Sequence, residues 1–406
     1  MTNMVFITGT DTGIGKTVAS CFLLRAFNAL GLKTFGLKPI ASGGVQNDDG
    51  KLRNQDALCL QRHASIQKPY HLVNPILFES IKEFTLREGK RIRPLLLVLS
   101  YLGYKKSARL SPSLFNASSC IELLHNFMLI HDDIIDRSDL RRGKPTLHKL
   151  LANAVKTNDQ EKLGYDLSII AGDIVYALAI DAFLLIDEPA ERKERALKYF
   201  IQTAAFTAMG EFIDTIHGVE QIEKISEKDI FLNYTLKTAR YTFDCPMVTG
   251  AILAGAKEKD IKLLSKLGIM IGQAFQIQDD IIGIFDSEKN IGKSILSDLA
   301  ESKKTILVCH AYNTLKGEQL KTFLMYFNKE NKNFDDLVAI REIFIQAGSL
   351  SYSLKQVKSR LKQSQIILST LKMSKPYRSV IEEAFNLLFE HSNNIAAQYG
   401  VAVKSN

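Results

Sequence analysis

The chain has 406 residues, 46% of them hydrophobic and 24% charged, which allows roughly two or three globular domains with sizeable cores. Its net charge of +8, without a basic run that alternates with aromatic residues, favours small anionic ligands and excludes a nucleic-acid binder. Five scattered cysteines without metal-ligand spacing indicate reduced thiols, so we expect a cytoplasmic protein. The longest apolar run, 174–186, is too short to span a bilayer, so we expect no integral membrane segment.

Residues 1–75 have the pattern of an α/β fragment. The sequence favours four elements in chain order: a strand at 4–8, a glycine-containing loop at 9–17, a helix at 18–30 and a second strand at 34–37. A glycine loop between a strand and a helix presents backbone N–H groups to a phosphate, and Lys16 adds a positive charge. Gly31 is placed to end the helix. The segment therefore predicts a phosphate-binding loop of P-loop type.

The same segment resembles dethiobiotin synthetase in four stretches: 9–17, 37–43, 53–58 and 73–75. The resemblance implies that Thr17 and Asp56 bind Mg²⁺, that Lys38 is an active-site lysine and that Ser42 contacts substrate. The matching positions are Gly13, Gly15, Lys16, Thr17, Lys38, Ser42 and Asp56. The resemblance stops at Pro75, before the family's other metal ligand and its adenine-recognition segment. We therefore expect a partial domain with no ligase activity and at most weak ATP binding.

From residue 76 to residue 406 we expect a second domain that is all-α, a helical bundle, because amphipathic stretches follow one another and strand-type alternation is scarce. The expected helices are 95–104, 113–136, 166–186, 191–217, 227–254, 258–285, 301–314, 333–347, 351–370 and 376–398.

Two acidic clusters lie inside apolar helical runs of this second part. Asp132 and Asp136 are four residues apart, so a helix would present both carboxylates on one face. A second pair, Asp279-Asp280, follows later. Like charges among apolar helices repel unless a cation joins them, and carboxylate oxygens suit Mg²⁺, which takes substrate phosphates as further ligands. The sequence thus predicts a site that holds a diphosphate through Mg²⁺.

The motifs of residues 76–406 resemble the trans-isoprenyl diphosphate synthases, of the geranylgeranyl diphosphate synthase type. The stretch 89–94 (Gly-Lys-Arg-Ile-Arg-Pro) matches one signature, 122–126 (Glu-Leu-Leu-His-Asn) a second, and 132–142, with its acids and the Arg141-Arg142 pair, a third. The isoprenoid synthase fold and a Mg²⁺-dependent prenyl transfer are what this resemblance implies.

The resemblance assigns the charged residues to two substrates and to metal. Isopentenyl diphosphate would contact Lys90, Arg93, His125 and Arg142. The allylic diphosphate would contact Arg141, Lys237, Thr238, Gln276, Lys293 and Lys303. The metal ligands would be Asp132, Asp136 and Asp279, with Asp133 and Asp280 in support. The family also implies a homodimer, and no residue is expected to act as a nucleophile.

Chain length is expected to be set by Phe127 and Met128, which lie five and four residues before Asp132. A large aromatic residue at the fifth position resembles short-chain synthases, which favours geranylgeranyl diphosphate as the product and farnesyl diphosphate as the second choice. Two other functions stay open from the sequence. The chain could be an ATP-dependent dethiobiotin synthetase or a bifunctional fusion, or its leader could be a non-catalytic nucleotide-binding module that regulates prenyl transfer.

Overall fold

The structure is a computed structural model that describes residues 16–36, 38, 45–46, 52–67, 77–105, 112–153, 158–286 and 303–399. The expected strand at 4–8 and four of the expected site residues, Gly13, Gly15, Ser42 and Lys293, lie outside these ranges. Contacts divide the chain into two compact units. Unit one comprises 1–88, 130–139 and 145–172, and unit two comprises 89–129, 140–144 and 173–406.

Unit one begins with a pair of packed helices, α1 (Lys16–Ala29) and α2 (Gln55–His63). Gly31, at φ 75°, ends α1 in the left-handed conformation that favours glycine, as expected. Asn54 begins α2, because its side chain accepts a hydrogen bond from the Ala57 N–H at 3.0 Å.

The second strand expected in the leader is absent from its described part. Thr34 to Gly36 form no strand, because the Thr34 N–H donates to Ser65 Oγ at 2.7 Å and its carbonyl accepts from the Ile66 N–H at 2.9 Å. These bonds occupy the backbone groups that a sheet would use. A two-residue antiparallel pair occurs instead, β1 (Val45–Gln46) and β2 (Leu52–Arg53), with Val45 opposite Arg53.

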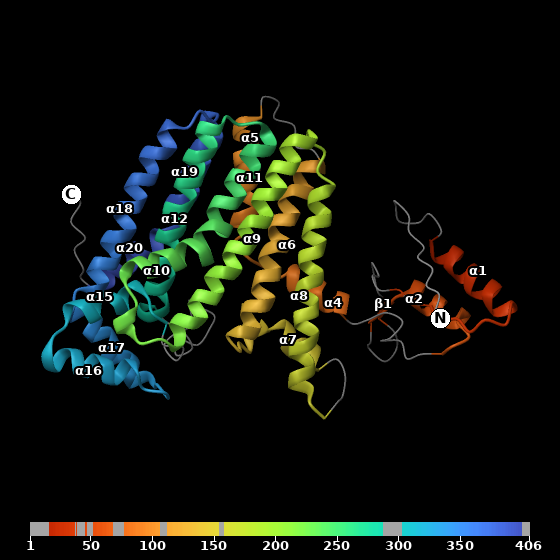
Figure 1. The fold of residues 1–406 in the computed structure, drawn as a ribbon, viewed down its shortest axis with the longest axis horizontal. Coiled ribbons are helices and arrows are strands. Elements are labelled where there is room, and N and C mark those ends of the chain that lie inside the picture. The colour runs from red at the N-terminus through yellow and green to blue at the C-terminus, as the bar shows by residue number, and fades with distance from the viewer. Residues whose placement is uncertain are drawn as a thin grey trace. The chain divides into compact units, whose positions relative to one another are not determined.

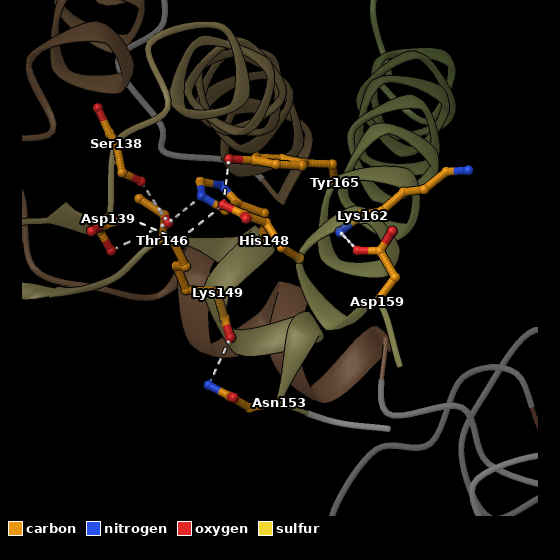
Figure 2. A network of polar contacts seen from close by, with 10 residues as sticks. Ser138, Asp139, Thr146, His148, Lys149, Asn153, Asp159, Lys162 and Tyr165 are labelled. Carbon is orange, nitrogen blue, oxygen red and sulfur yellow. Dashed lines mark hydrogen bonds and ion pairs between the residues drawn. The ribbon is translucent and has the colours of Figure 1, made fainter. Parts of the chain in front are cut away.

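The rest of unit one holds α4 (Leu77–Thr85), which packs on α7 (Leu147–Ala152), and the first part of α8 (Gln160–Leu184). Figure 2 shows the polar network around the start of α7, where the Thr146 hydroxyl donates to the Ser138 carbonyl at 2.9 Å and Lys149 pairs with Asp139 at 2.9 Å. These contacts hold the turn that follows Asp132 and Asp136.

Unit two is a helical bundle apart from the short strand pair at 140–145, which confirms the mainly all-α fold class expected. Its elements are α5 (Ile92–Tyr104), α6 (Pro112–Ile135, whose last turn belongs to unit one), α9 (Ala190–Val219), η1 (Ile222–Lys224), α10 (Glu227–Asn233), η2 (Tyr234–Asp244), α11 (Cys245–Ala254), α12 (Glu258–Phe285), α15 (Ile306–Thr314), α16 (Gly317–Phe327), α17 (Phe334–Gln346), α18 (Ser349–Thr370), α19 (Lys375–Leu388) and α20 (Glu390–Gln398).

In the bundle α11 packs on both α9 and α12, and α18 packs on α12 (Figure 1). η2 is a π-helix of 11 residues that packs on both α9 and α12. Glycines allow this close approach, since a Cβ on Gly210 would collide with the Lys237 backbone and one on Gly272 with Ala239. Long π-helices are rare and are commonly found at functional sites.

By length and composition alone α8 could cross a membrane, and one-third of its most apolar window is buried. Core helices of bundles pass the same test, so this is weak evidence for a membrane segment.

Candidate active site

A cluster of arginines surrounds one buried histidine in unit two. His125, on α6, is only 7% exposed. Burial lowers its pKa well below the usual value, and the nearby charges of Arg93, Arg142, Arg141 and Arg91 lower it further, so His125 is neutral at pH 7. Its buried Nδ1 has no hydrogen-bond partner among the residues that the structure describes. A buried polar atom without such a partner, close to several positive charges, is the geometry of an anion-binding site.

Contacts with η2 hold one of these arginines in place. Arg93, in the first turn of α5, donates from Nη2 to the Tyr241 hydroxyl at 2.9 Å and to Thr242 Oγ1 at 2.8 Å. Its guanidinium also lies over the Tyr241 ring, 4.5 Å from the centroid, and the His125 ring lies 6.0 Å from the same ring. Tyr241 thus orients both residues.

Two arginines of the cluster have a left-handed backbone. Arg91 precedes α5 at φ 47° and forms an ion pair with Glu122 of α6. Arg142 has φ 56° and is followed by Gly143 at φ 71°, so the hairpin of β3 (Leu140–Arg141) and β4 (Lys144–Pro145) turns with two positive φ angles. Non-glycine residues in this conformation cost about 1 kcal/mol or more and occur preferentially at binding sites.

The first acidic cluster occupies the C-terminal end of α6. Asp136 follows the helix and its N–H still donates to the Asp132 carbonyl at 2.8 Å, so the two residues lie one turn apart as expected. Both are partly exposed, whereas Asp133 is buried. The C-terminal end of a helix carries a partial negative charge, and the last turn of α6 holds no basic residue. The helix dipole repels carboxylates at this end of the helix, and a bound divalent cation would offset that repulsion.

η2, α9 and α12 position the second set of predicted residues. Lys237 of η2 pairs with Glu211 at 3.0 Å and Asp214 at 2.6 Å, both on α9. The hydroxyl of Thr238 donates to Gln276 Oε1 at 2.5 Å, and Gln276 Nε2 in turn donates to Asp280 Oδ1 at 3.0 Å. The structure therefore brings Thr238, Gln276 and Asp280 into one chain of hydrogen bonds.

A pocket opens beside this chain. Its wall includes Gln276, Asp279, Asp280, Gly283 and Lys303, with Phe344 among its apolar residues. Burial raises the pKa of Asp280 to about 7, against the opposing hydrogen bonds from Tyr234 and Gln276 and the charge of Lys303. Asp279 is exposed at the same wall. The pocket therefore contains two aspartates, which we expected to bind or support Mg²⁺, and a lysine, which we expected to contact the allylic diphosphate.

The two residues expected to limit chain length lie on α6 and are partly buried against the core. The Phe127 ring contacts Tyr176 of α8 with centroids 4.9 Å apart. Met128 packs against the same core, and Leu124, one turn earlier, is fully buried.

In the leader, Lys38 Nζ lies 2.8 Å from Asp56 Oδ2 as an ion pair. The structure therefore places the expected active-site lysine in contact with one of the two residues expected to bind Mg²⁺. Thr17 lies in the first turn of α1 and is partly exposed. Lys90 is exposed in the loop before α5.

Several residues of the site were not found from the sequence: Glu211, Asp214, Tyr234, Tyr241 and Thr242. They act on the predicted residues through contacts between distant parts of the chain. The local signal was only their position in expected helices, Glu211 and Asp214 in 191–217 and the other three in 227–254, which does not show which face they occupy.

Comparison with known proteins identifies the class. The polyprenyl synthetase family profile matches residues 74–344, and an AAA domain profile matches residues 3–95, the dethiobiotin synthetase-like leader. The chain belongs to the polyprenyl synthetase family and is a trans-prenyltransferase of isoprenoid biosynthesis. Members of this family use a divalent metal and act on isopentenyl and allylic diphosphates.

Individual relatives indicate which kind of prenyltransferase the chain resembles. The geranylgeranyl diphosphate synthase of Sulfolobus acidocaldarius is 33% identical over 69% of this chain and 79% of its own length. A short chain isoprenyl diphosphate synthase of Methanocaldococcus jannaschii is 31% identical over 73% and 84%. The crystal structure of a geranylgeranyl pyrophosphate synthase from Corynebacterium glutamicum, complexed with isoprenyl diphosphate and magnesium, matches with TM-score 0.70 and 26% identity over 81% and 92%. The chain is a short-chain prenyltransferase.

Proposed function

We propose that this protein condenses isopentenyl diphosphate with an allylic diphosphate in a Mg²⁺-dependent reaction whose main product is geranylgeranyl diphosphate, with farnesyl diphosphate as the second choice. The observation that carries the proposal is the buried, unpartnered Nδ1 of His125 inside a shell of four arginines. An anion of high charge offsets this concentration of positive charge, and isopentenyl diphosphate offers one.

The arginine cluster would bind isopentenyl diphosphate. Arg93 and Arg142 would donate to its phosphate oxygens as planar forks, with Lys90 at the exposed edge and His125 beneath. Tyr241 and Thr242 keep the Arg93 guanidinium from rotating away, so less side-chain entropy is lost on binding.

The allylic diphosphate would bind Arg141, Lys237, Thr238, Gln276 and Lys303, with Lys293 from outside the described residues. Asp132 at the end of α6, Asp136 directly after it, and Asp279 on α12 would hold Mg²⁺, which when bound would offset the negative charge of the leaving diphosphate. As the allylic C–O bond breaks, charge builds on the diphosphate, and Lys237 and Arg141 attract it more strongly than in the ground state.

An allylic carbocation then needs a dry apolar wall, which the core side chains of α6 and α8 supply. Phe127 and Tyr176 meet on this wall. They exclude water that would quench the cation, and they limit the length of the product tail. The double bond of isopentenyl diphosphate forms the new carbon–carbon bond, and the released diphosphate takes the proton that restores the alkene.

We also propose a cytoplasmic homodimer. Its support is an exposed apolar stripe on α9, formed by Met209, Phe212, Ile216 and Val219, which are 48–86% exposed at helical spacing. Two copies can bury such a stripe against each other. Sedimentation of wild-type protein and of Phe212→Glu tests this arrangement, with Phe334→Glu on α17 as an exposed-phenylalanine control.

We further propose that the prenyltransferase domain starts near residue 76 and that residues 1–75 are a partial domain without ligase activity. The support for this view is the incomplete ligase pattern, because the resemblance ends at residue 75, before the family's other metal ligand and its adenine-recognition segment.

The direct test of the proposed function is incubation of the purified chain with isopentenyl diphosphate and each allylic primer in turn, with Mg²⁺ and with a chelator. Product should form only with the metal. Equal turnover in excess chelator would refute the metal assignment, and no product with any allylic primer would refute the reaction.

A further inference from the structure

Three side chains of the leader that take no part in prenyl transfer meet between α1 and α2. Cys21 of α1 and Cys59 of α2 have their Sγ atoms 3.1 Å apart. His63, one turn after Cys59, places Nδ1 3.7 Å from that sulfur. One ligand atom from each of the three lies within 4.8 Å of the others. We propose that Cys21, Cys59 and His63 form a binding site for a thiophilic cation of the Zn²⁺ class.

The distances suit such an ion. With Zn–S near 2.3 Å and Zn–N near 2.05 Å, a tetrahedral site sets sulfur and nitrogen about 3.6 Å apart and the two sulfurs about 3.8 Å apart. The Cys59–His63 distance already matches at 3.7 Å. The sulfurs, at 3.1 Å, need to separate by about 0.7 Å, which is a small side-chain rotation. Since Cys59 and His63 are partly exposed, a fourth ligand from solvent can reach the ion.

The protonation states also fit. Burial, and contact with Cys59, raise the pKa of Cys21 to about 12, so without a cation the Cys21 sulfur is a neutral thiol. Binding of Zn²⁺ forms two Zn–S bonds and releases one proton from each thiol to solvent. His63 supplies the lone pair of a ring nitrogen and keeps its single N–H proton. In the metal-free protein Nδ1 lies 2.8 Å from the Cys59 carbonyl, so this contact is given up when Nδ1 binds the cation, and the N–H proton is then on Nε2.

A metal here has a structural reason. The buried core shared by α1 and α2 consists of only Cys21, Leu24, Ala57 and Leu60 among the described residues. A core of this size stabilises a small fold poorly, and small folds commonly use a metal for that purpose. Residues 21 and 59 are 38 positions apart, so a cation that joins them removes much of the freedom of the intervening chain.

A disulfide between the same cysteines is the competing chemistry. It needs sulfurs about 2.05 Å apart and an oxidising compartment. The sulfurs lie 3.1 Å apart, and a disulfide leaves His63 without a role. These observations favour the cation.

The test uses the reduced, metal-free full-length protein and Co²⁺, which gives a sulfur-to-metal charge-transfer band with thiolates but not with carboxylates. The band separates this site from the aspartates of the helical domain. We expect it to saturate at one Co²⁺ per chain, and Zn²⁺ to abolish it and release two protons. Cys21→Ser and Cys59→Ser should lose the band, and His63→Ala should weaken binding at least tenfold. Arg62→Ala, exposed on the same helix, and Cys309→Ser, a buried thiol elsewhere, should bind as wild type does.

Amide hydrogen exchange of the wild-type protein gives a second test that needs no variant. At Zn²⁺ about a hundredfold above its Kd, exchange of the α1 and α2 amides should slow by about a hundredfold, since binding to the folded state alone shifts the equilibrium by that factor. Three results would each overturn the proposal. The first is the absence of the band in reduced wild type, and the second is an unchanged band in Cys59→Ser. The third is loss of both thiols to a disulfide under mild oxidation without any Co²⁺ band. Prenyl transfer is measured on each variant, and it should not change.

Discussion

Gly89 packs directly on the guanidinium of Arg142: a Cβ built on Gly89 would lie 2.8 Å from Nη1 and 2.9 Å from Nη2. Any side chain at position 89 therefore moves the guanidinium that we assign to isopentenyl diphosphate. The loop before α5 and the turn of the β3–β4 hairpin are coupled through this contact.

Gly89→Ala should leave the free energy of unfolding nearly unchanged, because the displaced group is the flexible end of a side chain. It should raise KM for isopentenyl diphosphate about tenfold, since a charge-assisted hydrogen bond contributes about 1.5–3 kcal/mol and is weakened here. Steady-state kinetics for each substrate check this. An equal rise in KM for both diphosphates would show that Arg142 does not distinguish them. Gly218→Ala, at a glycine where an added Cβ would meet no described atom within 4 Å, is the control.

The pKa of His125 should rise when the site fills. Burial and the surrounding arginines lower this pKa in the free protein, and a bound diphosphate offsets much of the nearby positive charge. The imidazole signals in NMR titrations with and without isopentenyl diphosphate give both values. A pKa that is unaffected by the ligand would remove His125 from the binding site.

The same lowered pKa has a consequence for stability. Above about pH 6.5 the histidine is neutral in both the folded and the unfolded chain, and it adds no pH dependence. As pH falls below that value, the unfolded chain takes up a proton that the folded protein resists, and stability decreases. His125→Gln should therefore lose less stability than wild type between pH 7 and pH 5, as measured by denaturant unfolding.

Asp132→Ala and Asp136→Ala should each abolish turnover while the fold is kept. The two acids lie at the negative end of α6 with no basic residue in the last turn, so removing one relieves repulsion in the metal-free protein. Turnover and thermal midpoint are measured together, with the exposed Asp335→Ala as a charge-matched control. Normal turnover in a variant that lacks both acids would exclude them as metal ligands.

Phe127→Ala should lengthen the product. Its ring contacts Tyr176, and removing it leaves a void that an apolar tail can occupy. Chromatography of the dephosphorylated products measures the change, and Phe115→Ala, exposed on the same helix, is the matched control. If the product keeps its length, Met128 or Leu124 limits the chain length instead of Phe127.

Much of this architecture follows from the sequence, because helical periodicity reports which residues are buried. The helix expected at 258–285 is found at Glu258–Phe285. Boundaries were less accurate: α5 begins at Ile92 with Pro94 in its first turn, where a missing N–H costs little. The stretch expected at 376–398 divides at Phe389 into α19 and α20.

Other features depend on contacts that a linear pattern does not show. α16 was missed, although its buried Phe323 and Phe327 are four residues apart and signal a helical face. The close packing of η2 depends on Gly210 and Gly272 in two other helices. The contact of Arg93 with Tyr241 and Thr242 joins residues 148 and 149 positions apart. The motif residues could be predicted because each motif is local, whereas the side chains that orient them come from elsewhere in the chain.

One measurement tests the central claim most directly: a single preparation of the full chain assayed for both candidate reactions. With isopentenyl diphosphate, an allylic primer and Mg²⁺, we predict geranylgeranyl diphosphate as the main product. With diaminopelargonic acid, ATP and bicarbonate, we predict no dethiobiotin, and Lys38→Ala should leave prenyl transfer intact. Dethiobiotin formation that is lost in Lys38→Ala, together with no prenyl product, would contradict the account.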